Sequence, residues 1–455
     1  MDGKGKASQA RSKGLSSTLK EDRLSQLPDA LICQILYHLY TKESVKTSVL
    51  SKRWRHLWLW VPSLELWSFN FTDSNSFVSF GDRIFDFSRA SCIHKLSLSV
   101  FAETEDRLYS VKDVSFLTSW LDAATKRKIQ HLDLHLSEKF HFYMKPLKFY
   151  QCETLVCLRL FDVALDDASA HFVSFPCLKT MRLDRVLCPN ESTFEKLVSS
   201  CPVLEELEVD DLLGDANVFR VRSQSLKRFT LVRDYSYLSN PAVPGVVVDA
   251  PLLSRLSIND LASESFIVNN LAPKARLDIT ITFGSVDVDE FSKTSGIRSF
   301  LLGISKVGDM TLCADTFELL CEFLELEPLP QFGYMSRLYI GLRVSYLKWL
   351  PTFLEICPNL KSLILMWECS YEEMEQVSFT SVPECLISSL EFVDIQVPIL
   401  GHAAEMKLVR YLLKNSAVLK KLTLRLSDLS TREKSLRRRL QRIPRASTKC
   451  EVVVL

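Results

Sequence analysis

A short phrase of alternating leucines returns along most of this chain and limits how the chain can fold. Its fullest form is L-x-x-L-x-L, as in LVCLRL and LKSLIL. In an extended backbone the last two leucines project from one face, because successive side chains point to opposite sides. One short strand cannot bury that face, whereas stacked copies share a continuous core. The clear copies lie at residues 155–160, 178–183, 204–209, 226–231, 253–258 and 360–365, and less complete ones at 96–98, 132–134, 338–340, 390–395 and 422–424.

The spacing of these copies indicates the type of repeat. The best-defined copies, between residues 158 and 256, recur at intervals of roughly 22 to 27 residues, which fits leucine-rich repeats made of a strand and a returning segment. Proline introduces several copies, as in SFPCLK, SCPVLE and CPNLK. We therefore expect a curved α/β solenoid over residues 63–375. Between about 280 and 335 the phrase blurs, and no repeat boundary is predicted there.

The residues between the leucines should line the concave face of the solenoid. Such solenoids present extended binding surfaces, so we hypothesise that this face or its rim holds a partner protein. For any one of these residues taken alone, a solvated strand position is the favoured interpretation. In the clearest copies the candidates are Arg159, Arg182, Glu206, Glu208, Arg228, Thr230, Arg255 and Ser257.

Composition excludes several functional classes. The 455 residues include 56 basic and 55 acidic side chains, so net charge does not favour nucleic acid or an anionic membrane. No apolar run approaches the length of about 18 residues typical of a membrane span. The 13 cysteines are scattered and contain no C-x-x-C pair, which is typical of reduced thiols in the nucleus or cytoplasm and unlike a zinc site. We expect no metal and no cofactor.

No pattern in the chain indicates catalysis. The P-loop, G-x-S-x-G, H-E-x-x-H and Rossmann glycine motifs are all missing from the sequence. Cys152 with a nearby histidine would be a thiol nucleophile only with a lowered pKa and an orienting third group, and neither is indicated. We therefore expect no catalytic residue. A small-molecule pocket inside the solenoid would have no short motif, so that possibility stays open.

The N-terminal 62 residues divide into a polar tail and a helical segment. Residues 1–19 are rich in Gly, Ser and Lys, which predicts a disordered tail whose lysines serve as a solubilising segment or a weak nuclear address. In residues 20–62, Pro28 suits the first turn of a helix. Leu31 and Ile35 then recur at helical spacing, with Ile32 and Leu36 beside them. Thr41 and Ser51 are suitable N-caps for two further short helices.

The stretch VLSKRWRHLW at residues 49–58 interleaves basic and aromatic side chains, a pattern that also occurs in single-strand nucleic-acid binders. At helical spacing, however, Leu50, Trp54, Leu57 and Trp58 share one face, and the basic residues lie elsewhere. A segment of roughly forty residues cannot bury this much apolar surface alone. A helix-packed protein interface is therefore favoured over nucleic-acid binding.

These residues carry a resemblance to a known domain. Leu27-Pro28-Asp29, the Ile35-Leu36 pair and the run at 48–55 followed by Leu57-Trp58 resemble an F-box. The resemblance implies docking onto a Skp-like adaptor that links the chain to a cullin-based ubiquitin ligase. Trp54 and Leu57 are equally suited to holding the three helices together. The adaptor contacts implied position by position are Leu27, Pro28, Leu31, Ile35, Leu36, Val45, Val49, Leu50 and Trp54.

Residues 376–455 resemble the FBD domain that ends many plant F-box/leucine-rich-repeat proteins. The resemblance rests on Pro383-x-Cys385-Leu386, Ser388-Ser389-Leu390, Glu405, residues 408–415, Val418-Leu419 and Pro444-Arg445-Ala446-Ser447. Residues 397–404 depart from it, because they are apolar where that family carries an acidic or glycine-rich stretch. We expect this domain to extend or cap the solenoid, since a terminal repeat needs a closing element.

The FBD-like segment also contains an arginine run at residues 437–439, which allows two interpretations. The run could bind phosphates, or it could be the solvated face of a helix whose Leu436, Leu440 and Ile443 pack inward. The packing interpretation is favoured, since charge runs usually mark exposed helix faces. Arg432, Lys434, Arg442 and Arg445 belong to the same basic segment.

Together these resemblances imply a three-helix F-box, a curved leucine-rich-repeat solenoid and a C-terminal FBD cap. They imply a non-catalytic substrate-recognition subunit of an SCF-type cullin-RING E3 ubiquitin ligase. Its partners would be a Skp-like adaptor, the cullin and RING subunits reached through it, and a target protein that the sequence does not name. The alternative is a non-degradative scaffold that binds the adaptor or a partner without promoting ubiquitination.

Overall fold

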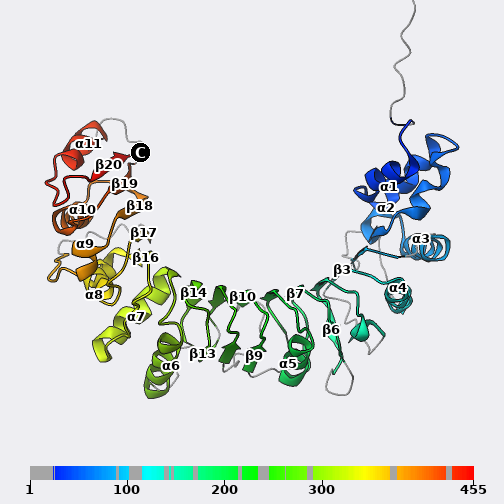
Figure 1. Cartoon of the computed structure of the whole chain (residues 1–455), viewed down its shortest axis with the longest axis horizontal. Helices are drawn as coiled ribbons and strands as arrows, with labels where there is room; N and C mark the ends of the chain where they lie inside the picture. Colours follow the sequence, from blue (N-terminus) through cyan, green and yellow to red (C-terminus); the bar gives the residue numbers. More distant parts are fainter. Residues whose placement is uncertain are drawn as a thin grey trace, which may run out of the picture.

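The computed structural model describes most of the chain as one arc with the N- and C-terminal regions at its two tips (Figure 1). The predicted tail at residues 1–19 lies outside the described residues. The structure describes residues 24, 26–88, 92–101, 115–137, 143–144, 148–167, 173–213, 218–233, 245–261, 263–283, 290–368, 377–426 and 433–455.

A parallel sheet lines the inside of the arc (Figure 1). Within the described residues it has fifteen strands, and its strand order follows the chain, as a solenoid requires. The strands are β1 (Ser63–Trp67), β2 (Lys95–Val100), β3 (His131–Leu136), β5 (Cys157–Phe161), β7 (Thr180–Asp184), β8 (Glu206–Asp210), β10 (Arg228–Arg233), β12 (Arg255–Asp260), β14 (Arg276–Ile281), β15 (Asp309–Leu312), β16 (Arg337–Arg343), β17 (Ser362–Glu368), β18 (Phe392–Ile399), β19 (Lys421–Leu426) and β20 (Glu451–Val454).

The outside of the arc carries the returning segments, which are helices in some repeats and short strands in others (Figure 1). A second parallel sheet contains β9, β11 and β13, and β4 pairs with β6. The ring of Phe194 meets that of Phe219 edge to face at 5.4 Å, so both kinds of return share one core. The segments are α3 (Ser74–Phe87), α4 (Ser115–Lys126), α5 (Glu191–Ser199), α6 (Glu290–Gly303), α7 (Ala314–Leu326), α8 (Leu350–Glu355), η3 (Ser68–Asn70), η4 (Lys148–Gln151), η7 (Val344–Trp349), β4 (Tyr143–Met144), β6 (Ala164–Leu165), β9 (Val218–Arg222), β11 (Gly245–Asp249) and β13 (Phe266–Asn269).

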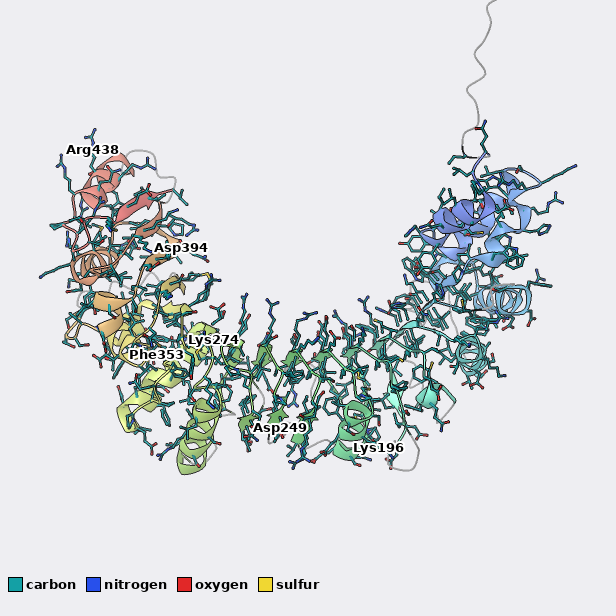
Figure 2. All side chains as sticks on the ribbon, viewed as in Figure 1. Lys196, Asp249, Lys274, Phe353, Asp394 and Arg438 are labelled. Carbon is teal, nitrogen blue, oxygen red and sulfur yellow. The ribbon has the colours of Figure 1, made fainter. Side chains whose placement is uncertain are left out.

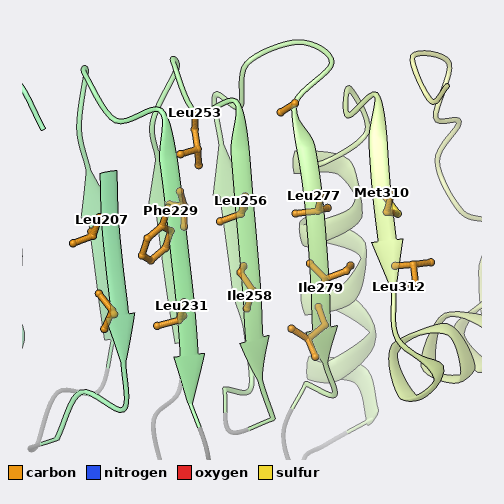
Figure 3. Packing of buried hydrophobic residues seen from close by; sticks show 14 of the residues in the cluster. Leu207, Phe229, Leu231, Leu253, Leu256, Ile258, Leu277, Ile279, Met310 and Leu312 are labelled. Atoms are coloured by element: carbon orange, nitrogen blue, oxygen red, sulfur yellow. The ribbon is translucent and has the colours of Figure 1, made fainter. Parts of the chain in front are cut away.

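The repeated leucine positions form continuous buried rows between the two layers. Leu207, Phe229, Leu256, Leu277 and Met310 lie opposite one another on five neighbouring strands (Figure 3). All five side chains are buried. Burying one such side chain stabilises the fold by about 1.5–3 kcal/mol relative to exposure, so the rows are the main source of stability. The predicted curved α/β solenoid is confirmed.

The part of the sequence in which the phrase blurs contains α6, β15 and α7. Strand β15 reads DMTL and has only Met310 and Leu312 as apolar residues. It still pairs in register with β14 and β16. The repeat is therefore present, although its phrase lacks the leading leucine.

The N-terminal tip has its own small core. It contains α1 (Asp29–Tyr37), α2 (Thr41–Lys46) and η1 (Thr47–Val49), followed by η2 (Trp54–Trp60). The last of these is a 3-10 helix and not the α-helix that its pattern predicts. Pro28 lies just before α1, in extended backbone, and not in the first turn. The residues that form this core are Ile32, Leu36, Trp54, Leu57 and Val61.

The helix α2 joins this tip to the solenoid. The Thr41 side chain does not cap α2 as predicted; its Oγ1 accepts a hydrogen bond from the Glu65 backbone N–H of β1 at 2.7 Å. Val45 packs against the solenoid core. The Lys42 ammonium lies 4.8 Å from the ring centre of Phe71. The first strand is therefore covered by the helical tip.

The C-terminal region continues the same sheet. Strands β18, β19 and β20 follow β17 in parallel register, so the expected extension of the solenoid is observed. The helices of this region are α9 (Glu384–Ser388), α10 (Ala403–Asn415) and α11 (Glu433–Gln441). The Ser389 hydroxyl donates to the Leu360 carbonyl at 2.9 Å, which ties α9 to the preceding repeat.

Glu405 has a clear local role at the start of α10. Its buried carboxylate accepts backbone N–H bonds from Leu400, Gly401 and His402 at 3.0, 2.7 and 2.9 Å. Gly401 has φ +90°, a left-handed conformation that glycine adopts without strain. The bond to the N-cap residue His402 is part of a capping box, and the other two fix the turn that precedes the helix.

Candidate protein-interaction surfaces

The helical tip exposes apolar side chains that its own core does not bury. Leu31 and Ile35 of α1 are 46% and 41% exposed, and Val49 and Leu50 are 84% and 66% exposed. The predicted broad apolar face of α1 is thus divided, because Ile32 and Leu36 turn inward. A helix that is apolar on both sides has a second surface to bury. We call Pro28, Leu31, Ile35, Val49 and Leu50 the tip apolar face.

An ion pair holds the two halves of this face together. The guanidinium of Arg53 lies 2.6 Å from the carboxylate of Asp29, at the start of α1. Arg53 also donates to the Leu27 carbonyl. The backbone N–H of Trp54 donates to the Ser51 hydroxyl at 3.4 Å, but η2 begins at Trp54 and its N-cap is Arg53, so the predicted Ser51 cap is wrong. The basic residues of VLSKRWRHLW therefore lie on the solvent side, opposite the buried Trp54.

The structure buries two of the predicted adaptor contacts, Leu36 and Trp54, and leaves two others, Leu27 and Val45, half-buried. Leu36 is fully buried and Trp54 is 5% exposed, so both belong to the core of the tip, because η2 packs on α1. Val45 is half-buried and faces the solenoid, since α2 covers β1. Leu27 is half-buried against the tip core. These four residues support the tip apolar face from beneath or beside it.

The predicted concave residues form two rows across the sheet. One row aligns Arg159, Arg182, Glu208, Thr230 and Ser257 on adjacent strands. The other aligns Glu206, Arg228 and Arg255. All eight alternate with the buried leucines and project toward the inside of the arc, where Figure 2 shows a dense layer of polar side chains. The sequence placed them on the correct face.

The structure adds residues that the sequence did not single out. Arg276 continues the second row on β14, and Asp309 and Arg337 follow it on β15 and β16. Three of the arginines in this row have acidic neighbours, because Asp309 is the register partner of both Arg276 and Arg337. Arg228 forms an ion pair with Glu206, and Arg337 lies 3.8 Å from Asp309. Arg276 was missed because its repeat has an incomplete leucine phrase.

A hollow of about 360 Å³ lies on the first half of the inner face. The His135 ring stacks on the Phe161 ring with centres 5.2 Å apart, and the Arg185 guanidinium lies 4.4 Å from the same ring. Spacing along one strand cannot reveal such neighbours, because His135 and Phe161 lie on different strands and Arg185 follows the end of a third. The hollow is lined by Asp133, His135, Arg159, Leu160, Phe161, Arg182 and Asp184.

The charged side chains that line this hollow interact mainly as close pairs. His135 Nε2 lies 2.9 Å from Asp133 Oδ1, and this hydrogen bond raises the pKa of His135. Arg182 lies 3.4 Å from Asp184 and 3.2 Å from Glu208. Burial raises the pKa of Asp184 even though Arg182 opposes the shift. The hollow thus offers both signs of charge beside an aromatic ring.

Neither a metal site nor a membrane-spanning helix is found in the part of the chain that the structure describes. Its His, Cys, Asp and Glu residues form no cluster of three or more able to hold an ion. Its helices are too short or too polar to cross a bilayer. The Cys152 thiol is buried, 3.9 Å from the Ile129 carbonyl, and serves packing.

The basic run of α11 lies on the solvent side of that helix. Leu436, Leu440 and Ile443 are buried, as the packing interpretation predicts, and the arginines at 437–439 are exposed. Arg437 donates to the Val454 carbonyl of β20 at 2.8 Å. Arg432 lies outside the described residues.

Three known protein families match the chain in the order of these regions. The F-box domain matches residues 24–66, which contain the tip apolar face. The leucine-rich repeats described for FBD-associated F-box protein At5g56370 match residues 117–276, which contain the central rows. The FBD family matches residues 376–424. An F-box followed by repeats indicates a protein that acts in substrate recognition, and such proteins are generally non-catalytic.

Similar proteins from Arabidopsis thaliana share this organisation over nearly their full length. Putative FBD-associated F-box protein At5g53635 is 53% identical over 95% of this chain and 100% of its own length. Putative F-box/FBD/LRR-repeat protein At2g05300 is 51% identical over 98% of this chain and 99% of its own. F-box/FBD/LRR-repeat protein At5g22660 is 41% identical over 96% and 97%. The chain therefore belongs to the F-box/FBD/LRR-repeat protein family.

Proposed function

We propose that this protein is the substrate-recognition subunit of an SCF-type cullin-RING E3 ubiquitin ligase. Its tip apolar face docks onto a Skp-like adaptor, and its concave face holds the target protein. The observation that carries the proposal is the exposure of Leu31, Ile35, Val49 and Leu50 on an F-box whose core is already complete. Exposed apolar clusters of this kind mark protein-binding sites.

The proposed action is proximity and not chemistry. Holding a target beside a charged ubiquitin-conjugating enzyme raises the effective concentration of the reacting groups. The fold suits this role, because the sheet runs without a break from β1 to β20 and α2 is bonded directly to β1. A target on the concave face would then keep a constant position relative to the adaptor.

Adaptor binding by the purified full chain tests the proposal. The Val49→Ser/Leu50→Ser variant removes the two most exposed anchors without touching the core of the tip. Anchors at the centre of an interface cost on the order of 2 kcal/mol each, so affinity should fall by about a hundredfold or more. Leu27→Ala/Pro28→Ala should also weaken binding, with an added effect on packing because Leu27 is half-buried.

A matched control separates this result from a general loss of apolar surface. Leu302 and Leu326, on α6 and α7, are 57% and 60% exposed and lie far from the tip in sequence and in the arc. Leu302→Ser/Leu326→Ser should bind the adaptor like the parent chain. A well-folded parent chain with no affinity for any Skp-like adaptor would refute the proposed docking.

We place this activity in the nucleus, the cytoplasm or both. The twelve cysteines in the described residues are free thiols, as a reducing compartment maintains them. Localisation of a fluorescently tagged full chain tests this assignment, and accumulation in the secretory pathway would contradict it.

A further inference from the structure

Three arginines stand side by side in the middle of the concave face. Arg228, Arg255 and Arg276 are register partners on β10, β12 and β14. Adjacent strands are about 4.8 Å apart, so the three side chains leave the sheet at nearly the closest spacing that a protein allows. Like charges directly opposite one another on neighbouring strands are destabilising. We call these three residues the arginine row.

Carboxylates lie at the two ends of the arginine row and not beside its middle residue, Arg255. Glu206 pairs with Arg228 on one side, and Asp309 lies near Arg337 on the other. Arg255 and Arg276 are exposed, and among the described residues neither forms an ion pair with a carboxylate. Asp278 lies on the same face, two residues after Arg276, and does not reach ion-pair distance. Asp309 is also the register partner of Arg276, so Arg255 is the member of the row that has arginines on both sides, and its positive charge is the least balanced.

The surroundings of the row suit an anionic ligand. Lys274 and Lys306 are exposed at the same edge of the sheet, where the Lys274 N–H donates to the Lys306 carbonyl at 2.9 Å. Lys274 lies toward the inside of the arc, opposite the side that carries Asp249 (Figure 2). Thr230 and Ser257 provide half-buried hydroxyl donors on the adjacent row. Cationic and neutral donors thus face the same space.

We propose that the arginine row binds an acidic segment of the target protein, rich in Asp and Glu. This inference rests on the proposed role of the concave face and names the class of segment that it accepts. Guanidinium groups bind carboxylates through two parallel hydrogen bonds, and the bound anion relieves the repulsion along the row. The outer two arginines are about 9.6 Å apart at their roots, which three residues of an extended peptide span. Because successive side chains of an extended peptide point to opposite sides, acidic residues at positions i and i+2 share one side about 6.6 Å apart, within reach of two arginines of the row.

The test is peptide binding to the intact chain, measured by fluorescence anisotropy. The probe is a labelled peptide with a central Glu-rich segment, and its reference has Gln at the same positions. The Glu peptide should bind, the Gln peptide should not, and added salt should weaken binding because the contacts are ionic and exposed. Arg255→Glu/Arg276→Glu should lower affinity by about tenfold or more, since two attractive contacts become repulsive.

A control variant with the same change in net charge makes the result specific. Arg222→Glu/Arg298→Glu alters two exposed arginines on the outer layer, in β9 and α6. It should bind the Glu peptide within about twofold of the parent chain, because at 0.15 M salt charges beyond a screening length of about 8 Å interact weakly. Equal losses in both double variants would mean a general charge effect and would overturn the proposal.

Two further outcomes would also overturn it. A phosphoserine peptide that binds through the arginine row while the Glu peptide does not would identify phosphate, and not carboxylate, as the ligand. No binding of either peptide, with adaptor binding intact, would reject the acidic segment and leave the adaptor role standing. Absence of adaptor binding by a chain that still binds the Glu peptide would instead reject the ligase role. The two failures are therefore distinguishable.

Discussion

The side chain of Thr41 and the backbone of Glu65 join the F-box to the solenoid. Thr41 Oγ1 accepts the Glu65 N–H at 2.7 Å, and Thr41 is buried at this junction. Buried backbone donors are rarely left without a partner, because the desolvation cost is then not recovered. The F-box is thus bonded to the first strand of the sheet and does not hang from a flexible linker.

Removing this acceptor should destabilise the junction. Thr41→Val keeps the shape of the side chain and leaves the Glu65 N–H without its partner, at a cost of about 1–3 kcal/mol in the free energy of unfolding. Urea denaturation of the full chain measures the change. Thr47→Val is the control, since the Thr47 hydroxyl only adds a bond to the Ser44 carbonyl, and it should cost less than about 0.5 kcal/mol. Equal stability of Thr41→Val and the parent chain would contradict the assigned role.

Glu405 should be the most sensitive position at the start of α10. Glu405→Ala removes the acceptor of three backbone N–H bonds and should lower the free energy of unfolding by about 3 kcal/mol. Glu405→Gln retains a carbonyl oxygen and should cost less. Glu384→Ala, at an exposed first-turn position of α9, should cost only about 0.3–1 kcal/mol. Thermal unfolding monitored by circular dichroism ranks the three, and a different order would refute this explanation.

Gly81 should not tolerate a side chain. A Cβ atom there would lie 2.1 Å from the buried indole of Trp120, a ring further fixed by its 2.8 Å bond to Asp82. Gly81→Ala should therefore destabilise by about 1–3 kcal/mol, despite the better helix propensity of alanine. Gly333→Ala meets no atom within 4 Å and should be close to neutral. If Gly81→Ala stabilises the chain in a denaturation experiment, the packing of α3 on α4 differs from that described.

The His135–Asp133 pair should make a pH-dependent contribution to stability. Its hydrogen bond raises the pKa of His135 above the ordinary value of 6.5. A raised pKa in the folded state means that the contribution is complete below pH 6.5 and is lost as pH rises through the higher folded value. Asp133→Asn should lower the pKa of His135 in an NMR titration and reduce this pH dependence. Asp278→Asn, on the same row, should change neither, and an unaltered His135 pKa in Asp133→Asn would refute the pairing.

Some parts of this structure follow from sequence because each strand carries its own signal. The alternation in LVCLRL identifies both the buried Leu158 and Leu160 and the outward Arg159 without reference to any neighbour. The strand at Met310 and Leu312 was missed, because two apolar residues do not stand out among helical segments. Its register with β14 and β16 comes from stacking, which one strand does not encode.

The exposed residues of the F-box were predicted less completely, because their exposure depends on how the helices pack on one another. Leu31 and Ile32 are adjacent apolar residues of α1, and only the packing of η2 decides that Ile32 is buried and Leu31 exposed. The same packing removes Trp54 from the predicted surface. On the concave face, the arginine row and the His135–Phe161 stack depend on contacts between strands. Such contacts require the register of the whole sheet.

Protein abundance in cells that express either the parent chain or the Val49→Ser/Leu50→Ser variant shows whether docking through the tip apolar face leads to degradation of targets. Both chains have the same concave face and should capture the same target proteins. Captured targets should accumulate in cells with the variant, because they are no longer brought to the ligase. Targets captured equally and present at the same level in both cells would contradict this prediction, and would indicate a scaffold that does not promote degradation.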